Sequence, residues 1–181
     1  TTNSDTAMLS ALVKLTFDWV RNKPKDVLEQ ARFVLKKANA LGNKTLQENA
    51  YHSIAQAYTS LRNYDSSKRY FTLALDANLG TKDFALKGLM HHDFGYSYYQ
   101  QNIFDSCLLH YHRSLELKKK YGTPKQVAAT LNGIGLVYRM RNNIATAASY
   151  YTEALNIYQK ENDKATLSVM LNIATLYNLQ K

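Results

Sequence analysis

Five histidines and one cysteine are the side chains of this chain that could bind a metal ion or act as a nucleophile. His91 and His92 are adjacent, so they point to different sides of a helix. His110 and His112 are two residues apart and also share no helical face. The sequence has no HExxH motif and no paired Cys-His motif of the zinc-binding type. It therefore predicts no metal site.

Cys107 cannot form an intramolecular disulfide, because the chain has no second cysteine. The positions 40 residues away on either side hold the small residues Ser67 and Ala147, so packing explains Cys107 better than nucleophilic chemistry. The Gly133-Ile134-Gly135 segment lies within a predicted helix and is no phosphate-binding loop. We expect neither enzymatic activity nor a cofactor.

The net charge of +9 could indicate nucleic acid, an anionic surface or an acidic partner. The basic residues are scattered, and the longest run is only Lys118-Lys119-Lys120, so a solvated surface is the simpler interpretation and nucleic acid is unlikely. No stretch approaches the roughly 18 apolar residues of a membrane span, and no signal peptide is recognisable. Because the sequence begins with Thr1 rather than Met, we expect a processed or excised chain.

An internal repeat positions these residues. In the first helix of each repeat, a small residue is followed three positions later by Tyr. In the second helix, a small residue, an aromatic residue and another small residue follow one another at helical spacings. The small residues that open this pattern are Ala55, Gly95, Gly135 and Ala174, at intervals of 40, 40 and 39. The aromatic residues of the second helix are Phe71, Tyr111 and Tyr151. Large and small residues alternate as interlocking helix layers require, and we expect Gly95 and Gly135 to be buried at helix crossings.

Turn residues divide the repeats into helix pairs. Gly42, Gly80 and Gly122 are expected to end second helices in the left-handed conformation, and Asn43, Thr81 and Thr123 to cap the next helices. Thr123-Pro124-Lys125-Gln126 reads as a capping box with proline at the first helical position. Within the repeats, an Asn is expected to close the first helix, at Asn63, Asn102 and Asn142 or Asn143.

The small-x-x-Tyr, small, aromatic and Ala-Leu series resembles the tetratricopeptide repeat, from about residue 44 to 181. The early Trp position of that family holds Tyr51, His91, Leu131 and Met170, and its closing Pro is missing. The 40-residue length is similar to the kinesin-light-chain and spindle-adaptor type. It also resembles the bacterial Rap and PlcR peptide-sensing type and sensory regions of diguanylate cyclases and histidine kinases.

The predicted fold is all-α, a right-handed solenoid of antiparallel helix pairs in one domain over residues 1–181. Residues 1–43 are a degenerate capping repeat, 44–81, 82–122 and 123–162 are repeats, and 163–181 is the first helix of a further repeat. The nine expected helices are 6–21, 25–41, 44–61, 65–78, 82–101, 104–120, 124–141, 144–160 and 163–180. The last helix is apolar all round, so we expect Ile173, Leu176 and Tyr177 to lose cover and the chain to continue or to form a homodimer there.

The resemblance implies a concave binding face lined by the first helices of the repeats. Its expected ligand-binding residues are His52, Gln56, His92, Tyr96, Tyr99, Asn132, Arg139, Asn172 and Asn178, with Thr59, Leu136 and Thr175 beside them. Leu131-Asn132-Gly133-Ile134-Gly135 resembles the Leu-Asn-x-Ile-Gly signature, whose Asn holds a ligand backbone in that family. The carboxylate clamp of chaperone-binding members is absent, since its positions hold His52, Gln56, Asp93, Ala129 and Gly133.

These features predict a protein- or peptide-binding module. The resemblance favours the sensory region of a larger bacterial signal-transduction protein, with a periplasmic position slightly ahead of a cytoplasmic one. The alternative is a scaffold or adaptor in a stable complex, without a switch driven by a ligand.

Overall fold

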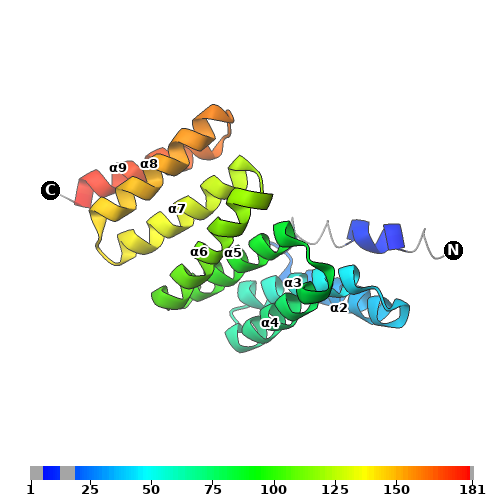
Figure 1. The fold of residues 1–181 in the computed structure, drawn as a ribbon. Helices are drawn as coiled ribbons and strands as arrows, with labels where there is room; N and C mark the ends of the chain where they lie inside the picture. Colours follow the sequence, from blue (N-terminus) through cyan, green and yellow to red (C-terminus); the bar gives the residue numbers. More distant parts are fainter. Residues whose placement is uncertain (1–5, 13–18, 180–181) are drawn as a thin grey trace. The chain divides into compact units, whose positions relative to one another are not determined.

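The computed structural model describes residues 6–12 and 19–179 of the chain. Residues 6–12 are helical, and eight longer helices follow (Figure 1). They are α2 (Pro24–Leu41), α3 (Lys44–Ser60), α4 (Tyr64–Thr81), α5 (Phe84–Gln100), α6 (Phe104–Tyr121), α7 (Pro124–Met140), α8 (Ile144–Lys160) and α9 (Ala165–Leu179). The described residues contain no strand, so the all-α prediction is confirmed. Residues 13–18, in the first predicted helix, lie outside the described residues.

The chain divides into two compact units, Thr1–Asp83 and Phe84–Lys181. In the first unit, α3 packs against both α2 and α4, and Leu9 joins a core cluster with Val34 and Leu46. In the second unit, α5 pairs with α6 and α7 pairs with α8, while α9 packs against α8 (Figure 1). The first helices α5, α7 and α9 also contact one another in sequence, which makes them a continuous layer. The prediction of a single domain over 1–181 stays a prediction.

At the predicted helix crossings, tyrosine rings of the second helices pack directly on glycines of the first helices. A Cβ atom added to Gly95 would lie 2.7 Å from Cδ1 of Tyr111, and one added to Gly135 would lie 2.6 Å from Cδ1 of Tyr151. Real Cβ contacts are essentially never that short, so only glycine fits at these two positions. The expectation that both glycines are buried under second-helix aromatic rings is confirmed.

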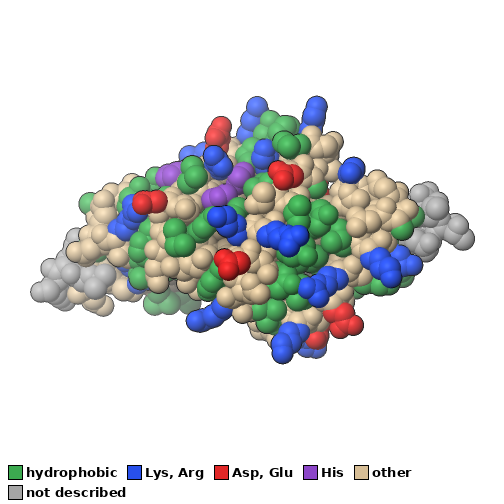
Figure 2. Space-filling view, turned by 90° about the horizontal axis from the view of Figure 1, so that it is seen from below, with side chains coloured by type: hydrophobic (Ala, Val, Ile, Leu, Met, Phe, Trp, Pro, Cys, Tyr) green, Lys and Arg blue, Asp and Glu red, His purple; other side chains and the backbone are tan. Residues whose placement is uncertain are grey.

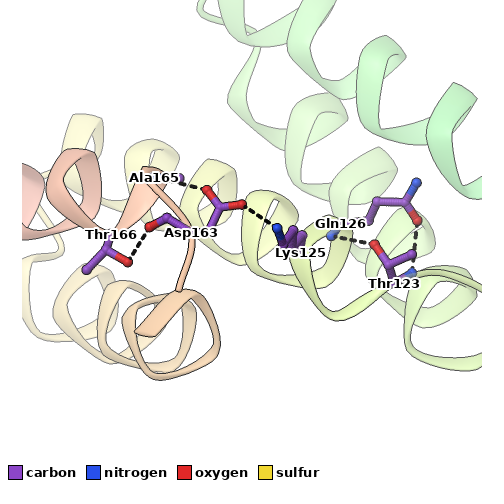
Figure 3. A network of polar contacts seen from close by, with 6 residues as sticks. All are labelled: Thr123, Lys125, Gln126, Asp163, Ala165 and Thr166. Carbon is purple, nitrogen blue, oxygen red and sulfur yellow. Dashed lines mark hydrogen bonds and ion pairs between the residues drawn. The ribbon is translucent and has the colours of Figure 1, made fainter. Parts of the chain in front are cut away.

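Polar contacts at the helix starts fix α7 beside α9 (Figure 3). Thr123 accepts a hydrogen bond from the Gln126 backbone N–H, and the Gln126 side chain accepts one from Thr123 N–H at 3.0 Å, as the capping box predicted. Lys125 Nζ lies 3.0 Å from Asp163 Oδ2, and Asp163 Oδ1 also accepts from Ala165 N–H at 2.8 Å. Both contacts lower the pKa of Asp163, the Ala165 bond more than the Lys125 bond. One carboxylate thereby joins the start of α9 to the start of α7.

Of the three predicted glycine helix ends, Gly42 was right, Gly80 was wrong, and Gly122 ends α6 as expected but without the left-handed conformation. Gly42 does take the left-handed conformation, at φ 62°. Gly80 instead lies inside α4, and Lys82 takes the left-handed conformation at φ 55°. Thr81 does not cap α5, because its hydroxyl donates to Glu48 Oε2 at 2.5 Å and so holds the last turn of α4. Gly122 is extended, at φ −100° and ψ −173°.

The closing residues inside the repeats were partly right. Asn102 and Asn142 end α5 and α7 in the left-handed conformation, at φ 59° and 57°. In the first clear repeat Arg62 takes that conformation, and Asn63 instead caps α4 by accepting from Ser66 N–H. Asn143 likewise caps α8. Each of these repeats therefore ends its first helix with a left-handed residue, and in two of them the next residue, Asn63 or Asn143, caps the second helix, whereas Ile103 makes no side-chain cap.

Candidate functional site

In the second unit, the first helices carry most of the predicted binding residues. We call the side of α5, α7 and α9 that bears Tyr96, Tyr99, Asn132, Arg139 and Asn172 the first-helix face. Tyr99, Asn132, Arg139 and Asn172 are half-buried, and Tyr96 is exposed. The rings of Tyr96 and Tyr99 stack with their centroids 6.4 Å apart.

Asn132 and Asn172 link two first helices. Asn172 Nδ2 donates to Asn132 Oδ1 at 2.9 Å, from α9 to α7. Asn132 lies three residues before Gly135 and Asn172 two residues before Ala174, so neighbouring positions of successive repeats hold side chains that hydrogen-bond to each other. The bond places both amides on the same face, as the sequence predicted, although the prediction did not include a contact between them.

Arg139 and Tyr99 lie near the hydroxyl of a tyrosine from a second helix. Tyr151, on α8, is fully buried. Burial raises the pKa of Tyr151 to about 12, while the positive charge of Arg139 opposes that rise and Tyr99 adds to it. The repeat position of Tyr151 predicts only that its ring packs in the core. It does not predict where the hydroxyl lies.

His92 lies at the α5–α6–α7 junction and is half-buried. Its Nδ1 is 3.1 Å from Thr130 Oγ1, and the same hydroxyl accepts from Lys118 Nζ at 3.1 Å. Burial, and then the Lys118 charge, lower the pKa of His92 to about 4. Lys118 is only 2% exposed, and burial lowers the pKa of its amine to about 8 while Asp93 opposes that shift. His92 is therefore held in a buried polar network.

Two predicted residues belong to the first unit, where the surroundings differ. His52 is fully buried, and its ring lies 6.0 Å from that of Phe71, so its assignment to a solvent-facing surface was wrong. The His52 side chain packs inward, toward the Phe71 ring of α4. Gln56 is half-buried, and Thr59 is buried and lies 2.7 Å from the Ser67 hydroxyl.

Asn178, the last predicted residue, is exposed at the end of α9. The apolar side chains of that helix are exposed as well, with Leu167 at 65%, Leu171 at 60% and Tyr177 at 67%. Ala174 is also exposed, whereas its counterparts Gly95 and Gly135 are buried, because no second helix covers α9 in the described residues. Leu176 was expected to lose cover but is buried at 3%.

A histidine pair that the sequence did not predict lies between α5 and α6. His91 Nδ1 and His110 Nδ1 are 3.0 Å apart, and both side chains are buried. The spacing of histidines along the sequence shows only which of them share a face of one helix, so it does not reveal a contact between two helices. No third His, Cys, Asp or Glu completes a metal-binding group among the residues that the structure describes. Over the same residues, no helix combines the length and apolar character that a membrane span requires.

Cationic side chains show no concentration on the face that Figure 2 displays. Lys and Arg are spread among hydrophobic and acidic side chains there (Figure 2). The basic residues, which are scattered along the sequence, are thus also scattered over this face. A site built on phosphate contacts would instead gather Lys and Arg on one face or stripe.

The chain is similar to known proteins in part of its sequence and in its structure. Residues 88–160 match the tetratricopeptide repeat family model, and no curated protein matches the chain. BtubC (BKLC) from P. vanneervenii superposes with a TM-score of 0.69 at 16% identity, covering 95% of this chain and 81% of that one. A Podosopora anserina putative kinesin light chain with nearly identical repeats superposes with a TM-score of 0.73 at 13% identity, covering 94% and 86%.

The third similar structure is that of a Rap protein complexed with Competence and Sporulation Factor. Its TM-score is 0.73 at 14% identity, over 86% of this chain. This chain spans only 44% of the length of that Rap chain. At these identities the likeness establishes the fold, and the family model adds a sequence match over α5 to α8. Residues 88–160 therefore belong to the tetratricopeptide repeat family, and the chain has the all-helical fold of a tetratricopeptide protein-interaction module.

Proposed function

We propose that the chain is the peptide- or protein-binding region of a larger bacterial signal-transduction protein, and that its ligand binds to the first-helix face. The Asn132–Asn172 contact carries the proposal. That bond uses the oxygen of Asn132 and one N–H of Asn172. The Asn132 N–H groups and the Asn172 oxygen remain as donors and acceptor for a ligand.

An extended peptide presents both N–H and C=O groups along its backbone, and a pair of Asn amides can bond to both. Tyr96 and Tyr99 add stacked rings, which give contact area at little cost in side-chain entropy. The Rap protein among the similar structures was solved with Competence and Sporulation Factor, which favours a signalling ligand over a purely structural partner. The fold alone would fit either.

A peptide array tests the proposal by comparing three proteins. The parent chain should bind a subset of short peptides. The double variant Asn132→Ala with Arg139→Ala should lose that subset, because it removes one amide and one guanidinium from the first-helix face. The matched control is Asn156→Ala with Lys160→Ala, which removes one amide and one positive charge from exposed positions of α8. Equal losses in both double variants would contradict the assignment of the site.

A second function, that of a scaffold in a stable complex, is favoured by one observation. The exposed face of α9 carries Leu167, Met170, Leu171 and Tyr177, at 65%, 50%, 60% and 67% exposure. Contiguous apolar surface of this kind marks interaction sites, and helix 165–179 contains no charged residue that would oppose a partner. A permanent partner on α9 would persist through purification, whereas a signalling peptide would exchange.

A further inference from the structure

Tyr151 reaches the first-helix face because Gly135 has no side chain. The Tyr151 ring comes from α8 and crosses α7 at Gly135, where an added Cβ would lie 2.6 Å from both Cδ1 and Cε1 of the ring. The ring therefore passes over the α7 backbone, and its hydroxyl lies near Arg139 of α7 and Tyr99 of α5. Both of these residues are on the first-helix face.

Two polar atoms at this point make no hydrogen bond of full geometry within the part of the chain that the structure describes, although the Arg139 side chain is near enough to the Tyr151 hydroxyl to interact with it. They are Arg139 Nε and Tyr151 Oη, and both are buried. Burying such groups without a partner costs free energy, so native proteins seldom retain them without a use. Two donors that converge on one point, one of them cationic, together suit an anionic oxygen.

The equivalent positions in the other repeats lack this combination. In the first unit, Phe71 fills the aromatic position and has no hydroxyl. In the α5–α6 repeat, Tyr111 supplies a hydroxyl whose pKa is raised chiefly by burial, and the carboxylate of Asp93 adds to that rise. Among the second-helix aromatic residues Phe71, Tyr111 and Tyr151, only Tyr151 has an arginine among the neighbours that act on its hydroxyl.

We propose that Arg139 and the Tyr151 hydroxyl form a subsite for a carboxylate side chain, Asp or Glu, of a peptide bound to the first-helix face. The proposal rests on the proposed function and names one chemical feature of the ligand. Arg139 is half-buried, so a carboxylate meets its guanidinium from the solvent side. A rotation of the side chain then turns Nε and one Nη toward the two oxygens.

The neutral alternative, a peptide carbonyl, is less well matched to this subsite. A carbonyl offers one uncharged oxygen, whereas a carboxylate offers two charged ones that fit the guanidinium fork. Arg139 also lies in the last turn of α7, where the carbonyl end of the helix stabilises the cation in the absence of a ligand. The net charge of +9 adds a long-range attraction for an acidic partner.

Paired peptides test the subsite. An array of short, blocked peptides carries each sequence twice, once with Gln and once with Glu at a single position. We expect the parent chain to bind the Glu member of its preferred pair about tenfold more tightly. Arg139→Gln should abolish that ratio, because the Glu member loses its charged partner and so loses more affinity than the Gln member. Arg139→Lys should restore only part of it, because Lys lacks the fork. Arg141→Gln, which removes the neighbouring exposed arginine that pairs with Asp105, should leave the ratio intact.

Tyr151→Phe separates a binding role from a structural one. The substitution removes a buried hydroxyl that makes no hydrogen bond of full geometry, so the melting temperature should change little. The Glu-to-Gln affinity ratio should nevertheless fall severalfold. A ratio that survives both Arg139→Gln and Tyr151→Phe, in a protein that still binds peptides, overturns the subsite alone. If the parent chain binds no peptide of either kind, the proposed function fails and the subsite fails with it.

Discussion

At the scale of single residues, His91 and His110 face each other through Nδ1 atoms 3.0 Å apart. One ring must donate and the other accept, so the pair holds one proton between these two atoms. Phe94 packs on the His110 ring with centroids 4.2 Å apart, and the Arg113 charge acts on both histidines. Burial and the Arg113 charge therefore disfavour the binding of a second proton by the histidine pair.

Acid should therefore weaken the fold through this pair. Burial, chiefly, lowers the pKa of His91 to about 3 and that of His110 to about 4, against an ordinary value of 6.5. Below pH 6.5 the unfolded chain takes up protons that the folded chain does not, so stability is present above that pH and is lost as the pH falls toward 4. We expect the free energy of unfolding, measured by urea titration, to drop by at least about 1 kcal/mol over this window.

A variant that copies the next repeat provides the comparison. The positions equivalent to His91 and His110 are Leu131 and Tyr150, 40 residues further on. The double variant His91→Leu with His110→Tyr should show a shallower pH dependence, with the remainder coming from His92. His112→Gln changes an exposed histidine of α6 and should behave like the parent chain. Parallel pH profiles for the parent and the double variant would show that the pair does not control acid stability.

Some of the site residues could be placed from the sequence, and others could not. Asn132 and Asn172 could be placed on one face because they occupy neighbouring positions of adjacent repeats. Tyr151 could not be assigned to that face, since the direction of its hydroxyl depends on the Gly135 crossing. His52 occupies the same repeat position as Asn132 but is buried and packs toward the ring of Phe71, a contact between two helices that the repeat pattern does not reveal.

At the scale of elements, close helix crossings set the stability of the second unit. We predict that Gly95→Ala and Gly135→Ala each destabilise the fold by about 1–3 kcal/mol, as overpacking of a well-packed core does. The added Cβ would lie 2.7 Å and 2.6 Å from a tyrosine ring, respectively, and neither ring has free space. Thermal melts of the two variants measure the effect.

Gly80→Ala is the matched control for that prediction. Gly80 lies inside α4, is exposed, and has nothing within 4 Å of an added Cβ. The same substitution should therefore stabilise the chain there by about 0.5–1 kcal/mol, since alanine is the better helix former. If all three variants changed the stability in the same direction, the helix crossings would not be as close as described.

The helices themselves could be predicted well, because hydrophobic periodicity and the capping box at Thr123 are local signals. The boundary between α4 and α5 was predicted less well. Gly80 and Thr81 carry the usual local signature of a helix end, but Thr81 bonds to Glu48 of α3. That contact between distant residues outweighs the local preference, and no single-helix pattern reveals it.

At the scale of the whole molecule, α9 leaves an apolar helix face without a second helix. Sedimentation velocity should show self-association of the parent chain, and Leu171→Gln with Tyr177→Gln should reduce it, because both side chains are more than half exposed. Leu79→Gln on α4, where the leucine is 68% exposed, should have no effect. Association that is unchanged by the α9 variant would remove the evidence for an interface there.

The central claim is that the first-helix face of the second unit binds a peptide, and the side-chain amide signals of its asparagines test this most directly. A peptide selected from the array is titrated into the isotope-labelled chain, and the Asn NH₂ resonances are followed by NMR. The account predicts that Asn132 and Asn172, which share the 2.9 Å bond, shift together and saturably, while Asn156 on α8 stays in place. Saturable shifts at Asn156, with none at Asn132 and Asn172, would contradict it.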